Sequence, residues 1–247
     1  TLHKDGYTTL LGLISHEYFH TWNVKRLRPA EFTRYDYTQE NYTELLWFFE
    51  GFTSYYDDLM LLRCGLIDAQ RYLKLLTKTV NAVAATPGRA VQSVAAASFD
   101  AWVKYYRTDE NTPNATVSYY AKGSLVALAL DLTLRSGRNT ATLDDLMRWL
   151  WQQSGGGPIT HDLIATGLRE LGKRAFSTEL AAWVDGRSEL PLDELLREAD
   201  VVSLHLPLTH DACKGLVMRH FPAQRHRAGH RFLPLQARPQ HHPFMRG

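Results

Sequence analysis

Apolar residues recur at helical spacing along most of the chain, in segments that each end at an identifiable stop. The first predicted helix runs from Leu10 to Val24, and the pair Arg28-Pro29 follows it. The second runs from Asn41 to Cys64, with Gly65 placed as its C-cap. No strand-like alternation of apolar and polar residues competes with these helices. The sequence therefore predicts a mainly α fold.

The later helices follow residues that cap helix N-termini well, because their side-chain oxygens accept bonds from free backbone N–H groups. We expect helices over residues 69–85, 119–135, 143–153, 160–173 and 177–183. The expected N-terminal residues of four of them are Asp68, Thr142 with Asp145 as a capping box, Thr160 and Ser177.

The character of the sequence changes near Leu190. A short helix is expected over 192–198 and a buried strand over 200–207, while Arg, His and Pro dominate from residue 218. Seven of the 28 basic residues and none of the 26 acidic residues lie in 212–247. We therefore expect a helical body (1–190), a helix–strand segment (191–217) and a basic, disordered tail (218–247).

Bulk features narrow the class of protein. No run of about 18 apolar residues exists, so we expect a soluble chain that does not span a membrane. Cys64 and Cys213 form no CxxC pair, which argues against a disulfide framework or a cysteine metal site. The chain starts without Met or a signal peptide, so we expect it to begin inside a longer protein, and its compartment, cytoplasm or periplasm, stays open.

The residues His16-Glu17-Tyr18-Phe19-His20 form an HExxH motif on the first predicted helix. Histidines at i and i+4 lie on one helical face, so His16 and His20 can both reach one metal ion. Glu17 is offset from that face and can approach a water bound to the metal. The alternative is a pair of solvated or core histidines without a ligand.

Glu50 is the candidate third ligand, since a catalytic zinc takes three protein ligands and one water. It follows an apolar run, Leu45 to Phe49, where an unpaired carboxylate would cost several kcal/mol. An ion pair with an arginine is the alternative. Asp57, two turns further along the same face, is placed to fix the ring of a ligand histidine, or is a solvated helix acid.

Five segments resemble the glycyl aminopeptidases, metallopeptidase family sixty-one of the gluzincin clan. They are HEYFHTWNVKRLRP (16–29), EGFTSYYD (50–57), PGR (87–89), SFDAW (98–102) and SYYAKG (118–123), and the likeness covers about residues 8–195. The resemblance implies a thermolysin-like helical catalytic domain with an irregular C-terminal extension, one Zn²⁺ per chain and a peptide substrate.

The resemblance also implies roles for individual residues. Tyr120 would donate its O–H to the oxyanion formed when water attacks the peptide carbonyl, and Glu17 would act as the general base. From the residues alone, Tyr120 could equally be an aromatic residue that packs at a helix start. In this family, the element that binds the substrate ammonium group lies upstream of the HExxH motif, with a β-domain before the helices and a PDZ-like domain after them.

A second resemblance is confined to residues 192–216, which are similar to a strand and loop of D-2-hydroxyacid dehydrogenases. No GxGxxG turn follows a strand anywhere in the chain, so we expect no NAD site and no cofactor-binding residues other than the metal ligands. We also expect no nucleic-acid binding by the tail, which lacks interleaved aromatic residues. This C-terminal region resembles the translation product of a joined or misassembled reading frame.

Two functions follow from these observations. The first is a zinc-dependent metallopeptidase, aminopeptidase-like, that uses a metal-activated water. The alternative is a catalytically inactive zinc-binding fragment of such an enzyme, joined to an unrelated C-terminal sequence. The sequence does not determine the preferred N-terminal residue of the substrate or the oligomeric state.

Overall fold

The computed structural model describes residues 4–136 and 141–199. Within these ranges the chain is helical and forms no strand, and its β-type pairing is limited to isolated bridges between Asn23 and Leu27 and between Pro29 and Ile159. The mainly α prediction is confirmed. The predicted strand at 200–207 and the basic tail lie outside the described residues, and the predicted unit boundaries stay a prediction.

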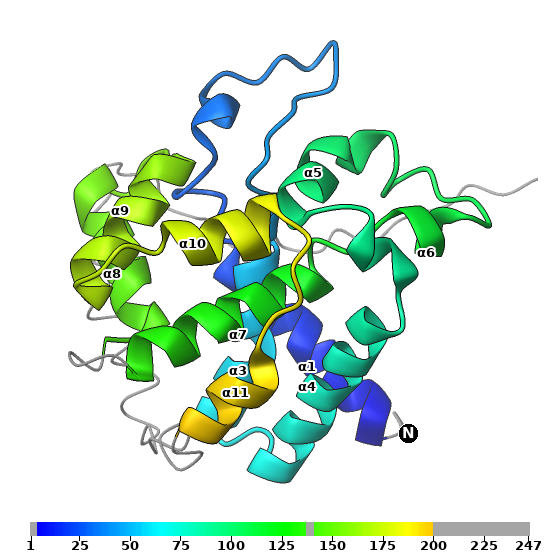
Figure 1. Ribbon diagram of the computed structural model, residues 1–247, viewed down its shortest axis with the longest axis vertical. Helices are drawn as coiled ribbons and strands as arrows, with labels where there is room; N and C mark the ends of the chain where they lie inside the picture. Colours follow the sequence, from blue (N-terminus) through cyan, green and yellow to red (C-terminus); the bar gives the residue numbers. More distant parts are fainter. Residues whose placement is uncertain (1–3, 137–140, 200–247) are drawn as a thin grey trace, which may run out of the picture.

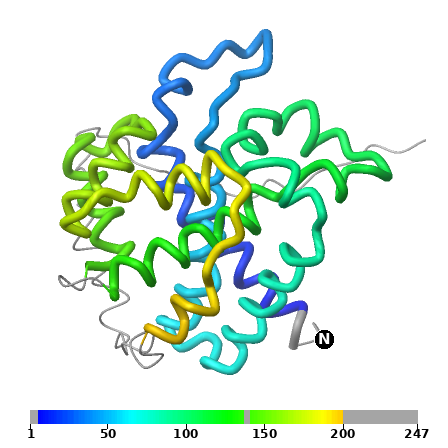
Figure 2. Tube along the Cα trace, viewed as in Figure 1, coloured from blue at the N-terminus to red at the C-terminus, as the bar shows by residue number. Residues whose placement is uncertain are grey.

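Six helices of twelve or more residues form the frame seen in Figures 1 and 2. They are α1 (Lys4–Phe19), α3 (Gly51–Arg63), α4 (Ala69–Ala84), α7 (Ala121–Ser136), α8 (Leu143–Ser154) and α9 (His161–Gly172). Shorter helices are α2 (Leu46–Phe49), α5 (Val94–Phe99), α6 (Thr112–Ala115), α10 (Ser177–Leu180) and α11 (Leu192–Glu198). Single turns are η1 (Ala30–Thr33), η2 (Pro87–Ala90), η3 (Asp100–Trp102) and the π-helical turn η4 (Ala181–Asp185).

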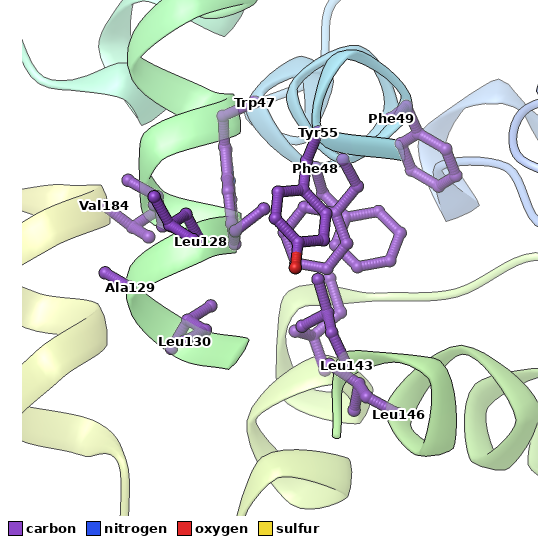
Figure 3. Packing of buried hydrophobic residues seen from close by; sticks show 14 of the residues in the cluster. Trp47, Phe48, Phe49, Tyr55, Leu128, Ala129, Leu130, Leu143, Leu146 and Val184 are labelled. Carbon is purple, nitrogen blue, oxygen red and sulfur yellow. The ribbon is translucent and has the colours of Figure 1, made fainter. Parts of the chain in front are cut away.

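Helix α7 lies at the centre of the molecule, as Figure 1 shows. Every residue from Lys122 to Leu132 is buried, which is the pattern of a helix enclosed on all sides. It contacts α2, α3, α4, α8, α9 and α11. The aromatic run before Glu50 forms much of its packing surface: Trp47, Phe48 and Phe49 are fully buried and share one cluster with Leu128 and Leu143 (Figure 3).

Helices α3 and α7 meet through two glycines. A Cβ on Gly51 would lie 2.6 Å from the Cα of Gly123, and a Cβ on Gly123 would lie 2.7 Å from the Trp47 carbonyl oxygen. Both distances are too short for any side chain, so the two backbones touch. The contact brings the start of α3, with Glu50, close to the start of α7, with Tyr120.

The predicted helix starts agree with the structure at three of four positions. Asp68 and Thr160 accept bonds from the N–H groups of Arg71 and Leu163, and Thr142 forms the full capping box with Asp145. Ser177 is instead the first residue of α10, whose N-cap Phe176 makes no side-chain cap. Gly65 follows α3 with φ +70°, as a C-terminal glycine requires.

The first two helices differ from their predicted bounds. Helix α1 ends at Phe19, five residues early, because residues 20–27 turn back on themselves through backbone bonds such as Lys25 N–H to the His20 carbonyl. The predicted second helix begins only at Leu46, since residues 34–44 form the long loop at the top of Figures 1 and 2.

The apolar stripe of α1 faces outward in the described part of the chain. Leu10, Leu13, Ile14 and Tyr18 are 41–56% exposed. The opposite face, which carries the two histidines, packs against α3. Periodicity therefore identified the helix but did not show which face is inside.

Candidate metal centre

His16 and His20 lie one turn apart at the C-terminal end of α1, with ring centroids 4.6 Å apart and planes at 90°. Their side chains are only 14% and 13% exposed. The turn that follows the helix and the start of α3 enclose them. The i and i+4 spacing thus brings both rings to one partly buried place, as the motif predicts.

Glu50 reaches the same place from the joint between α2 and α3. Its Oε2 atom lies 3.3 Å from His16 Nε2 and 3.2 Å from His20 Nε2. One ligand atom from each of the three residues lies within 4.8 Å of the others. Among the described residues, Glu50 forms ion pairs with these two histidines and with no arginine. The structure therefore brings the three predicted ligands together.

The second nitrogen of each imidazole ring is held by an acceptor. His16 Nδ1 lies 3.2 Å from Oδ2 of Asp57, and His20 Nδ1 lies 2.9 Å from the carbonyl oxygen of Asn23. A carboxylate and a carbonyl both favour a hydrogen on Nδ1, so both Nε2 lone pairs point at the shared position near Glu50. This is how proteins orient histidines that bind a metal, and it places Asp57 in its predicted position.

The charges of the cluster fit a cation. Burial alone would lower the pKa of His16, but bonds with Asp57 and Glu50 outweigh it and raise the pKa to about 9. Burial would raise the pKa of Glu50, but the two histidines lower it to about 2. Burial raises the pKa of Asp57 despite its bond with His16. The acids that favour positive charge on the two imidazoles would equally favour a cation bound between them.

The turn after α1 contains a site residue that the sequence did not single out. Asn23 is fully buried, and its Nδ2 donates to the Phe49 carbonyl at 3.1 Å and lies 3.2 Å from Thr53 Oγ1. Its own carbonyl holds His20. The next residue, Val24, has φ +126°, which a β-branched residue adopts only when its surroundings force it. No sequence signal marks this turn, because the role of Asn23 depends on its contacts with Phe49 and Thr53.

Glu17 and Tyr120 line one cleft with His16 and Asp57. The cleft has a volume of about 600 Å³ and runs between α1, α4 and the start of α7. Glu17 is exposed to it. The ring of Tyr120 stacks near that of His16, with centroids 6.2 Å apart. The residue types needed for acid–base chemistry and for oxyanion binding therefore open on one space with His16, one of the three candidate ligands.

Three further tyrosines surround Tyr120. Its ring lies 4.8 Å from that of Tyr119 and 5.5 Å from that of Tyr105. Burial raises the pKa of Tyr120, and the Glu50 carboxylate and Tyr106 raise it further, so its phenol stays protonated and able to donate. Tyr105 and Tyr106 belong to a stretch without helical periodicity, and only the fold brings them to the centre.

Comparison with known proteins finds similarity to peptidases. Residues 9–126 match the model of the M61 glycyl aminopeptidase family. A solved structure, described as an aminopeptidase N family protein from Idiomarina loihiensis, is 44% identical over 79% of this chain, with a TM-score of 0.75. The chain covers 34% of the length of that protein. Among curated proteins, none matches the chain.

The findings also bear on two further expectations, the dehydrogenase resemblance and the lack of a membrane-spanning segment. The dehydrogenase resemblance at 192–216 is not borne out, since the matches are to peptidases; the described part of that stretch is mainly helix α11, which packs on α7. None of the helices in residues 4–136 and 141–199 has the length and apolar character needed to cross a membrane.

Proposed function

We propose that the chain is the catalytic core of a zinc-dependent peptidase, starting from the match of residues 9–126 to the model of the M61 glycyl aminopeptidase family. The observation that carries the proposal is the convergence of His16 Nε2, His20 Nε2 and Glu50 Oε2, with both Nδ1 atoms held from behind. Two imidazoles and one carboxylate are a common ligand set of catalytic zinc, which keeps a position open for water.

The remaining residues supply the chemistry around that position. Bound zinc would lower the pKa of a water molecule and polarise the substrate carbonyl. Glu17 lines the cleft and is exposed to it, so its carboxylate can accept the proton of the attacking water and pass it to the leaving amine. Tyr120, kept neutral by its surroundings, can donate to the oxyanion. Asp57 and the Asn23 carbonyl hold the two imidazoles in place.

Removal of the N-terminal residue of a peptide is the proposed reaction. The substrate class comes from the family and from the name of the solved relative. A zinc-binding chain without turnover is the second candidate. The chain spans about a third of the length of that relative (34%).

The test joins metal content to turnover. Purified chain should hold one zinc, measured by elemental analysis, and should release the chromophore from glycyl or alanyl p-nitroanilide. Glu17→Gln keeps the side-chain shape but cannot accept the proton, so zinc should stay while turnover falls about a thousandfold. Tyr120→Phe should lower kcat about a hundredfold with little change in KM.

The outcomes separate the candidates. Zinc without turnover in the parent chain would favour the second candidate. Turnover that survives Glu17→Gln would remove Glu17 as the base, and absence of zinc would end both proposals.

A further inference from the structure

A second cavity opens beside the candidate centre, between the segment that precedes α2 and the segment from α5 to the loop after η3. Its volume is about 450 Å³. Its lining carries no charged side chain and is rich in aromatic rings; the residues are Phe32, Tyr35, Asn41, Thr43, Leu46, Ser98, Ala101, Trp102 and Tyr106.

The rim of this aromatic cavity consists of large side chains left in contact with solvent. Tyr35, Trp102 and Tyr106 are 44%, 47% and 63% exposed. Adjacent exposed aromatics cost free energy in water, and such groups commonly bind a partner or ligand. Trp102 also ties the two walls together, because its Nε1 donates to the carbonyl of Asn41 at 3.0 Å. The two walls of the cavity are therefore held together by a hydrogen bond.

Two residues connect the aromatic cavity to the candidate centre. Tyr106 lines it and also contacts Tyr120, whose pKa it helps to raise. Leu46 lines it from α2, and its carbonyl accepts the N–H of Glu50 at 2.7 Å. A peptide bound at the centre thus has this cavity within reach on the side of Tyr106, and the cavity shares no lining residue with the charged cleft that contains Glu17, Asp58 and Lys78.

We propose that the aromatic cavity binds one large apolar side chain, preferably aromatic, of the peptide that the candidate centre cleaves. The proposal rests on the proposed function. A charged side chain would lose its hydration here without gaining a partner, while a phenyl ring would bury its area against Phe32, Tyr35 and Trp102. The volume lies within the range of small ligand sites.

The experiment measures binding without turnover. Zinc-loaded Glu17→Gln protein is titrated by calorimetry with tetrapeptides in which a single Phe, Leu, Gly or Lys moves along an otherwise Gly/Ala sequence. At one position, Phe should bind about tenfold or more tighter than Gly, since burial of a ring gives at least that ratio, and Lys should bind no better than Gly.

Variants of the cavity test its identity. Ala101→Leu, made in the same Glu17→Gln protein, fills the cavity and should abolish the preference for Phe while Gly peptides bind as before. Tyr35→Ala removes one wall and should reduce the preference several-fold. Tyr7→Ala is the matched control, because Tyr7 lies on α1, is 53% exposed and does not line the cavity. If Ala101→Leu fails to fold by circular dichroism, the comparison of Tyr35 with Tyr7 decides.

Equal affinity for Phe and Gly at every position would overturn the proposal, and so would a preference unchanged by Ala101→Leu. Self-association of the chain that Tyr35→Ala weakens would assign the cavity to a second copy and also overturn it. The same titration on metal-free protein separates the two proposals. If the protein prefers Phe but the parent chain takes up no zinc and shows no turnover, the cavity is supported as a side-chain site and the peptidase proposal is contradicted.

Discussion

Helix α3 faces a polar cluster on each of two sides. One cluster is the candidate metal centre, and the other pairs its charges within the protein. On the α1 side, Asp57 holds His16 of the candidate centre. On the α7 and α8 side, Tyr55, Tyr56 and Arg63 meet two aspartates in the interior. The clusters lie within about two turns of each other along one helix, yet only one of them resembles a binding site.

The interior cluster is closed. Asp131 is 1% exposed and accepts bonds from the Tyr55 hydroxyl at 2.7 Å, Arg135 Nε at 2.8 Å and the Leu143 N–H at 2.6 Å. Asp144 similarly pairs with Arg63 and the Tyr56 hydroxyl. Each carboxylate meets donors and a cation from the protein itself, so no further ligand is needed.

The candidate centre is open by contrast. Two histidines direct Nε2 at the same oxygen of Glu50, an arrangement that stays favourable only with protons or a cation between them. Paired charge inside a protein is therefore not in itself a sign of a site. Donors that converge from two elements on one point, with their orientation fixed from behind, are the distinguishing feature.

The largest expected effect comes from breaking the closed cluster. Asp131→Ala leaves Arg135 and the Leu143 N–H without their acceptor, so the free energy of unfolding should fall by about 4 kcal/mol. Urea unfolding followed by circular dichroism measures it. Zinc per folded chain should be unchanged; a variant that unfolds like the parent would show that the cluster does not stabilise the fold.

Loss of a metal ligand should instead act mainly on zinc affinity. His20→Ala removes one of three ligand atoms, so zinc affinity should fall a hundredfold or more, roughly 3 kcal/mol, while the metal-free protein, which loses the bonds of His20 to Glu50 and to the Asn23 carbonyl, should lose less stability than Asp131→Ala does. Competition with a chromogenic chelator measures the affinity. His161→Ala, on α9, is the matched control and should keep parental affinity. Equal affinity in the two variants would remove His20 from the centre.

A smaller loss of zinc affinity is expected from a change at Asp57, which bonds to the candidate ligand His16. Asp57→Asn keeps the shape but weakens the bond to His16 Nδ1, so zinc affinity should fall about tenfold to a hundredfold. The same chelator competition applies, at constant pH. If affinity is unchanged, Asp57 is a structural acid, as the sequence alternative allows.

The smallest effect concerns Asp58, which lies beside Asp57 in the charged cleft. Burial and the neighbouring Asp57 raise its pKa to about 6, from the usual value of 3.8. An acid whose pKa is raised by folding favours the folded state when protonated, so stability is lost as pH rises from about 4 to 6. Asp58→Asn should therefore stabilise metal-free protein by about 1 kcal/mol at pH 7.5, allowing for partial exposure, and by almost nothing at pH 4. Urea unfolding at both values tests it, and a pH-independent difference would contradict it.

The parts that could be predicted from the sequence are those fixed by local geometry. The HExxH spacing places two rings on one helical face, and an acid after an aromatic run needs a cation nearby; both follow from short segments. Helix caps such as Thr142 are equally local. Their roles in catalysis stay predictions, but the structure does bring these residues together.

The parts that were missed depend on contacts distant in sequence. The orientation of α1 is set by what packs against it, so the periodicity of Leu10 to Tyr18 could not reveal that this stripe is exposed. Asn23 matters only because α3 passes beside it, and Tyr106 only because its loop folds back to Tyr120. The closed cluster around Asp131 joins α3, α7 and α8, and only its pair with Arg135, four residues along α7, follows a local pattern.

The contact between Gly51 and Gly123 has a consequence for how this centre can vary. Glu50 precedes one glycine and Tyr120 lies three residues before the other, so the spacing between a ligand and an oxyanion donor is set by two touching backbones. Side chains in an interface can be exchanged in compensating pairs, but a backbone contact offers nothing to exchange. Any residue with a Cβ at either position would separate the two helices, and no single substitution at the other position could restore the contact. Both positions must therefore stay glycine for this spacing to be kept.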